Sequence, residues 1–182
     1  MERKLNTNNE MKQAFLSYDI SDISAYIQLA DAKVSIIMGA VVALIAGALA
    51  CYNPISETLL KIKPCSWIGI ILSIFTLLLS ISLILVFVFG ILTIRGHVSK
   101  IGYKSKWFLS LSSKVYSFDA YKQDIKDMSN EDIIENMALE LYKLNDINRR
   151  KAKMLKLTIC FFASTLISAT VTGCILLFIT IL

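Results

Sequence analysis

The stretch SWIGIILSIFTLLLSISLILVFVFGILTI, residues 66–94, contains 29 consecutive residues without a charged side chain. As a helix it would be about 43 Å long, more than the roughly 30 Å hydrocarbon core of a bilayer. It has no Pro, and its two Gly residues lie near its ends, so nothing inside it breaks a helix. The stretch therefore predicts a membrane-spanning helix with room to tilt.

Two further uncharged runs have the length of a membrane span. Residues 34–52 form a run of 19 and residues 157–182 a run of 26, where about 20 apolar residues suffice for a helix to cross. Hydrophobic residues make up 55% of the chain, charged residues 18%, and the mean hydropathy is +0.62, which leaves little sequence for a separate water-soluble domain. The sequence predicts an all-α membrane protein of three transmembrane helices with a helical cytoplasmic juxtamembrane region.

The basic residues between these runs predict the orientation. Of the 19 Lys and Arg residues, 4 precede the first run, 2 lie between the first two runs and 13 lie in residues 95–156. Because cytoplasmic loops have an excess of Lys and Arg, we expect the N-terminus and the long middle segment inside the cell. The expected segments are a cytoplasmic N-terminal helix (1–33), transmembrane helix 1 (34–52), a short external loop (53–65), transmembrane helix 2 (66–94), a basic helical cytoplasmic region (95–156) and transmembrane helix 3 (157–182).

Helix signals extend two of the spans into the flanking segments. From about Glu10, apolar residues recur at helical intervals without Gly or Pro before Gly39, so one helix is expected to enter the first span unbroken. Ser129 is a suitable N-cap followed by acidic residues, and no Gly or Pro occurs again before Gly173. The helix starting there is expected to continue into the third span. Its apolar cytoplasmic face needs a partner, either the N-terminal helix or the same helix of another subunit.

The connection between the first two spans is expected to be short and polar. Pro54 and Pro64 lie near its ends, which is typical of a turn. Cys51 and Cys65 flank it, and two interpretations remain open: a disulfide on an oxidising face of the membrane, or two small packing residues.

Small and hydroxyl-bearing residues share one face in each predicted span. In lipid, such faces allow helices to approach closely and to form interhelical hydrogen bonds. They fit packing within one chain, packing between subunits, or a pore lining in an oligomer. The residues predicted to pack are Gly39, Ala43, Gly47, Ser73, Thr76, Ser80, Thr165, Ser168 and Thr172.

Basic and aromatic residues alternate after the second span, between Arg95 and Phe108. Such a stretch can lie at the membrane interface, or it can bind a phosphate and stack a base. We find no Cys/His cluster of zinc spacing, no glycine-rich phosphate loop and no catalytic pair or triad. We therefore expect no metal, no cofactor and no enzymatic activity.

Three short motifs lie beside the spans: Leu29-Ala30-Asp31-Ala32-Lys33 before the first, Trp107-Phe108 after the second, and Ile147-Asn148-Arg149-Arg150-Lys151-Ala152-Lys153 before the third. Together they resemble the transmembrane effector family of the Pycsar anti-phage systems. The resemblance covers about residues 20–180. It implies an effector in the bacterial inner membrane that responds to cyclic CMP or cyclic UMP, made on infection by a uridylate or cytidylate cyclase. It further implies that the effector then impairs the inner membrane and kills the cell.

The resemblance gives two interpretations of the charged residues beside the spans. In one, Asp31 forms an ion pair with Arg150, or with its neighbours Arg149 or Lys151, and holds two helices together. In the other, basic groups bind the cyclic phosphate while an aromatic ring stacks on the pyrimidine. The residues considered for nucleotide binding are Arg149, Arg150, Lys151, Lys33, Trp107 and Arg95.

Two functions follow from these patterns. The first is a homo-oligomeric membrane effector whose partners are the bilayer and the cyclic nucleotide, with no nucleic acid polymer. The second is a membrane adaptor that recruits a soluble partner through the apolar face of the helix starting at Ser129. A transporter is disfavoured because no ionisable residue lies within the three apolar runs.

Overall fold

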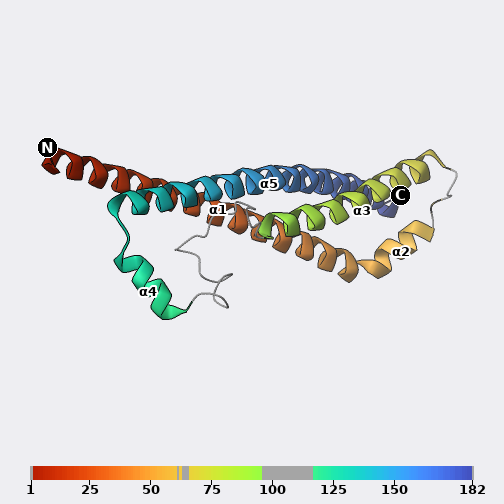
Figure 1. Ribbon diagram of the computed structural model, residues 1–182. Coiled ribbons are helices and arrows are strands. Elements are labelled where there is room, and N and C mark those ends of the chain that lie inside the picture. The colour runs from red at the N-terminus through yellow and green to blue at the C-terminus, as the bar shows by residue number, and fades with distance from the viewer. Residues whose placement is uncertain (1, 61, 63–65, 96–116, 182) are drawn as a thin grey trace. The chain divides into compact units, whose positions relative to one another are not determined.

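The computed structural model describes residues 2–60, 62, 66–95 and 117–181, with side chains from residue 8 onward. These residues form five helices and no strand: α1 (Glu2–Ala50), α2 (Tyr52–Leu60), α3 (Trp67–Ile94), α4 (Phe118–Lys126) and α5 (Asn130–Ile181) (Figure 1). Within the described part of the chain, α1, α3 and α5 are long and apolar enough to cross a membrane. The predicted all-α fold with three spans is confirmed.

The two long helices are continuous, as their sequences predict. α1 has 49 residues and α5 has 52. At the start of α5, the Ser129 hydroxyl accepts a hydrogen bond from the Asp132 N–H (3.2 Å), and the Asp132 carboxylate accepts one from the Ser129 N–H (3.0 Å). This reciprocal arrangement is a capping box, which satisfies two N–H groups that the first helical turn leaves unpaired. The predicted N-cap is confirmed.

The connection between the first two spans was predicted to be a turn, but it begins with the helix α2. In this helix the Thr58 hydroxyl donates to the Pro54 carbonyl at 2.8 Å. Pro54 is the third residue of α2, where the missing N–H is not needed for helical hydrogen bonding. A proline in this position therefore marks the first turn of a helix here. Cys51 has a free, exposed thiol, while Cys65 and the predicted disulfide lie outside the described residues.

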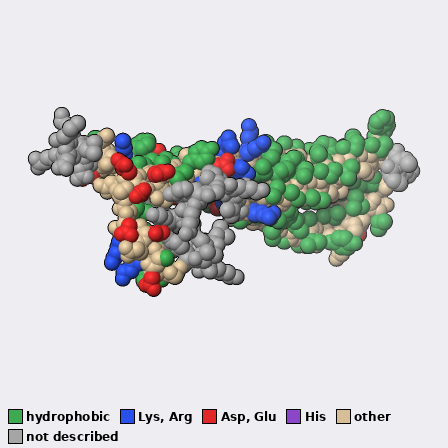
Figure 2. All heavy atoms as spheres, viewed as in Figure 1, with side chains coloured by type: hydrophobic (Ala, Val, Ile, Leu, Met, Phe, Trp, Pro, Cys, Tyr) green, Lys and Arg blue, Asp and Glu red, His purple; other side chains and the backbone are tan. Residues whose placement is uncertain are grey.

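The chain forms two compact units. Residues 1–28 and 96–149 form one, which we call the hydrophilic unit, and residues 29–95 and 150–182 form the other, the membrane unit. The membrane unit contains the three uncharged runs, and hydrophobic side chains cover its visible face in Figure 2. The helices α1 and α5 contribute residues to both units.

The core of the membrane unit joins α1, α3 and α5. Ile37, Val41 and Val86 are buried together, and partly buried residues of all three helices pack around them. The rings of Phe89 and Phe161 stack with centroids 5.4 Å apart, an aromatic contact that adds to simple burial. Other large apolar side chains of the same helices face outward, as a lipid environment favours; they include Ile36, Ile74, Ile167, Leu177 and Phe178.

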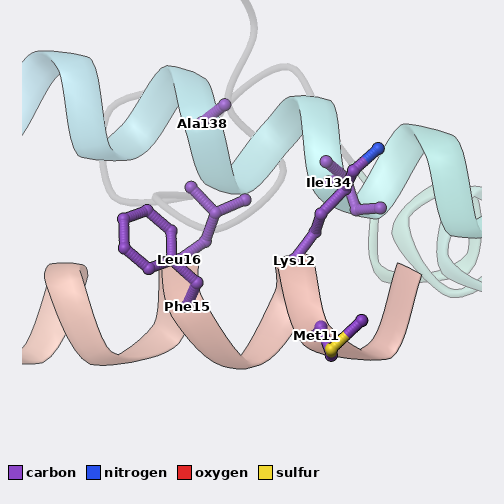
Figure 3. A pocket seen from close by; sticks show the side chains of 6 residues that line it. All are labelled: Met11, Lys12, Phe15, Leu16, Ile134 and Ala138. Carbon is purple, nitrogen blue, oxygen red and sulfur yellow. The ribbon is translucent and has the colours of Figure 1, made fainter. Parts of the chain in front are cut away.

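In the hydrophilic unit, the first part of α1 lies beside the first part of α5. A groove between them is lined by Met11, Lys12, Phe15 and Leu16 of α1 and by Ile134 and Ala138 of α5 (Figure 3). Met137, on the same helix, is buried. The apolar face predicted for α5 therefore has the N-terminal helix as its partner, the first of the two possibilities considered.

Candidate functional site

An ionic contact of the membrane unit lies at the start of its α5 segment. The ammonium group of Lys151 donates to both carboxylate oxygens of Asp31, at 2.6 and 2.7 Å. The Lys151 side chain is 10% exposed and that of Asp31 39%. A charged group so far removed from water requires a partner of opposite charge. Asp31 supplies that partner and joins α1 to α5.

The predicted pairing of Asp31 with Arg150 is corrected to Lys151. Lys151 lies on the buried face of α5, seven residues before the buried Thr158, whereas Arg150 is exposed. One residue turns a helix by about 100°, so adjacent positions face different neighbours. On α1, Asp31 follows the buried Ala30 and lies close to the face turned toward the other helices.

The other described residues considered for nucleotide binding are exposed. Lys33 and Arg95 are exposed residues of the membrane unit. Arg149 belongs to the hydrophilic unit, where its side chain is 82% exposed and pairs with Asp146 at 3.1 Å. Trp107 lies outside the described residues. A nucleotide pocket built from all six residues remains a prediction.

A face of hydroxyl groups continues along α5 from Lys151. Thr158, Thr165 and Thr172 follow it at intervals of seven residues, and Ser168 lies on the same face. Thr158, Thr165 and Ser168 are fully buried, and the hydroxyl oxygen of Thr172 is buried as well. We call these four residues the hydroxyl seam. The three of them that were predicted to pack, Thr165, Ser168 and Thr172, do lie inside the membrane unit.

Two hydrogen bonds link this face of α5 to neighbouring helices. The Thr165 hydroxyl lies 3.0 Å from Ser82 Oγ of α3 and 2.9 Å from the Phe161 carbonyl of its own helix. Near the end of α5, the hydroxyls of Thr180 and of Thr58 in α2 are 3.2 Å apart. Sequence reasoning missed Ser82 and Thr58, because a hydroxyl in an apolar run does not indicate which helix it faces.

The glycine stripe of α1 and the hydroxyl stripe of α3 do not pack inside the chain. Gly39, Ala43 and Gly47 are exposed, and a Cβ built at Gly39 or Gly47 meets no atom within 4 Å. The buried face of α1 holds Ile37, and Gly39 lies about 200° around the helix from it. Ser73, Thr76 and Ser80 of α3 are exposed as well. The expectation that these six residues pack within one chain is therefore corrected. Their packing between copies of the chain stays a prediction.

A close approach between helices occurs at a glycine that sequence reasoning did not single out. A Cβ added at Gly90 of α3 would lie 2.9 Å from the Met38 sulfur and 3.6 Å from a Val34 methyl group of α1. Gly90 was interpreted only as a residue near the end of a span. The sequence offered no signal for this contact, since it depends on how α1 is rotated against α3.

The hydrogen bond between α3 and α5 gives a first testable prediction. In a double-mutant cycle with Ser82→Ala and Thr165→Val, we expect a coupling of about 0.6 kcal/mol in the free energy of unfolding, measured in bicelles. Thr170→Val is the matched control, because Thr170 is exposed on the same helix and donates only to the Leu166 carbonyl. A coupling energy of zero between Ser82 and Thr165 would show that this hydrogen bond does not stabilise the bundle.

The fold and the site define a small helical membrane protein with several spans, whose charged contact lies at the end of a span. Among the described residues, no group of three or more His, Cys, Asp or Glu side chains could hold a metal ion. A family model described as the Pycsar effector protein domain matches residues 15–180. The chain belongs to this family, as its motifs predicted, and is an anti-phage defence effector associated with the membrane and with a partner cyclase. No curated protein and no solved structure matches the chain.

Proposed function

We propose that a cyclic pyrimidine nucleotide, cyclic CMP or cyclic UMP, activates this effector and that the active form makes the inner membrane leak. Loss of membrane integrity then kills the infected cell. In this proposal the N-terminus and the hydrophilic unit face the cytoplasm, where the partner cyclase releases its product. The effector needs no cofactor and catalyses no reaction. The observation that best supports the proposal, beyond the family itself, is the contact of Lys151 with Asp31.

This contact has the chemistry for binding a phosphate by exchange. A cyclic nucleotide has one negatively charged phosphodiester, and two of its oxygens can take the positions that the Asp31 oxygens hold near Lys151. The exchange keeps the charge around Lys151 balanced, because one anion replaces another. Asp31 is the more exposed partner, so water can solvate its carboxylate after the exchange. Of the other residues considered for nucleotide binding, Arg150, Lys33 and Arg95 of the membrane unit would attract the anion by their charge.

Activation is proposed to involve several copies of the chain. The exposed stripe of Gly39, Ala43 and Gly47 offers a surface without bulky side chains, which suits close helix contact in lipid. Ligand binding would favour the open assembly only by its difference in affinity for the open and closed states.

The test is ion release from liposomes that contain the purified protein, with an entrapped dye as a second readout of the size of the leak. Cyclic CMP, cyclic UMP, cyclic AMP and cyclic GMP are added separately, and we expect ion release with one pyrimidine nucleotide only. The matched controls are liposomes without protein and liposomes with a Lys151→Gln variant, which should respond at least tenfold more weakly. Absence of release with all four nucleotides, despite confirmed insertion, would overturn the proposal.

A membrane adaptor is the second candidate, favoured by the groove in the hydrophilic unit. Its lining is almost entirely apolar, and Met11 and Phe15 are more than half exposed. An apolar helix of a soluble partner would fit such a surface. This function predicts that a partner co-purifies with the wild type and not with a Phe15→Asp variant, and that no leakage accompanies its binding.

A further inference from the structure

Two hydroxyls of the seam differ from the other hydroxyls of the spans. Most Ser and Thr side chains here donate to the carbonyl of the residue one turn earlier, as hydroxyls in membrane helices usually do. Ser168 Oγ and Thr172 Oγ1 are buried, yet they have no hydrogen-bond partner among the described residues. The residues that do bond back within the apolar segments are Ser35, Ser73, Ser80, Ser82, Thr93, Thr158, Thr165, Thr170 and Thr180.

The unpaired hydroxyls lower the cost of bringing water into this part of the bundle. A buried hydroxyl without a partner is destabilising, and a water molecule that reaches it restores its hydrogen bonds. Opening the bundle at Ile37, Val41 and Val86 would instead expose carbon surface to water, which is unfavourable. Ser168 and Thr172 lie one helical turn apart, so a single water file can contact both. Hydration along the seam is therefore less costly than hydration along the apolar core.

The seam extends over about 21 Å of α5, and the exposed Thr180, about two turns further on, continues the row of hydroxyls. From Thr158 to Thr180 the helix rises about 33 Å, close to the roughly 30 Å thickness of the hydrocarbon region. One end leads toward the Asp31–Lys151 pair, and the other reaches the contact of Thr180 with Thr58. Between these ends, Ile159, Ile167 and Leu177 cover the outer side of α5.

We propose that the hydroxyl seam is the path by which water and small monovalent cations cross the membrane in the active protein. The path runs within one chain, between α5 and its neighbours, and the hydroxyls of the seam are buried there. Hydroxyl oxygens replace part of the hydration shell of a cation such as K⁺. This inference rests on the proposed function for its trigger, the exchange of Asp31 for a phosphate at Lys151. Beyond the proposed function, it states where the path lies and that only water and small cations pass through it.

The test measures K⁺ efflux and dye release from liposomes for a double variant, Ser168→Ala with Thr172→Val. With the nucleotide that activates the wild type, we expect K⁺ efflux to fall at least tenfold while nucleotide binding stays unchanged. Thr170→Val is the matched control, since it makes the same change two residues away on the exposed side of α5 and should leave efflux unchanged. Efflux equal to that of the wild type in the double variant would overturn the proposal.

A second arm opens the protein without nucleotide. Lys151→Asp places two carboxylates together with Asp31 and should separate α1 from α5, giving a constant K⁺ leak that excludes a large dye. The Ser168→Ala and Thr172→Val changes should abolish this leak. If Lys151→Asp leaks and no nucleotide acts on the wild type, the proposed trigger fails and the path stands. If neither the Lys151→Asp variant nor the wild type with nucleotide leaks, both proposals fail. A leak that releases the dye as readily as K⁺ would overturn the narrow path within one chain.

Discussion

Asp31→Asn should destabilise the protein more than Lys151→Met, although each change removes one side of the same ion pair. Asp31→Asn leaves the ammonium group of Lys151 in a site where only 10% of its side chain is exposed. Lys151→Met leaves the carboxylate of Asp31 with 39% exposure, so water can solvate it. We expect a loss of about 2 to 3 kcal/mol for the first change and about 1 kcal/mol or less for the second.

The measurement is the free energy of unfolding in bicelles for both single variants and for the double variant. The double variant should recover most of the stability lost in Asp31→Asn, because no buried charge then remains unpaired. Asp22→Asn is the control, as Asp22 is an exposed residue of the same helix. Equal losses in the two single variants would mean that burial of Lys151 does not determine the energy of the pair.

Gly90→Leu should give a larger steric effect than the same substitution at Gly39, Gly47 or Gly173, where an added Cβ meets no atom within 4 Å. The Cβ at Gly90 would lie 2.9 Å from the Met38 sulfur, and the rest of the side chain has to displace α1. Overpacking of this kind costs about 1 to 3 kcal/mol. Gly90→Ala should have a small effect, because the end of the Met38 side chain can rotate away and Ala favours the helix by up to about 1 kcal/mol.

The control for this prediction is Gly173→Leu. A Cβ built at Gly173 meets no atom within 4 Å, so the same substitution adds no clash there. Both variants are compared by their free energy of unfolding in bicelles. A Gly90→Leu variant as stable as Gly173→Leu would contradict the close approach of α1 and α3.

The spans and their continuity could be predicted because the bilayer and the backbone restrict the choices. A run of 29 uncharged residues has one stable conformation in lipid, a helix. The start of α5 followed from Ser129, since a side-chain acceptor at this position satisfies a free N–H of the first turn. The absence of Gly and Pro from there to Gly173 then predicted the single long helix that is observed.

The contacts between helices could not be predicted to the same degree. They depend on the rotation of each helix about its axis, which a nearly uniform apolar run leaves undetermined. For that reason Asp31 was assigned to Arg150, one residue from its actual partner Lys151. The stripe containing Gly39 was expected to pack and is exposed, while Gly90 has the close contact. The helix α2 was missed because Pro54 indicates a turn and the first turn of a helix equally well.

The seven-residue spacing of Thr158, Thr165 and Thr172 affects how firmly α5 is held along its own axis. A shift of α5 by seven residues, about 10 Å, would bring one threonine into the place of the next, with the same hydroxyl facing α3. The threonines therefore do not distinguish one axial position of α5 from another. The axial position of α5 is instead determined by contacts that occur once, namely the Asp31–Lys151 pair and the stacked rings of Phe89 and Phe161. A single polar residue fixes the register of a coiled coil in the same way. In this effector, the charged contact thus sets the register of a helix that is otherwise repetitive on its inner face.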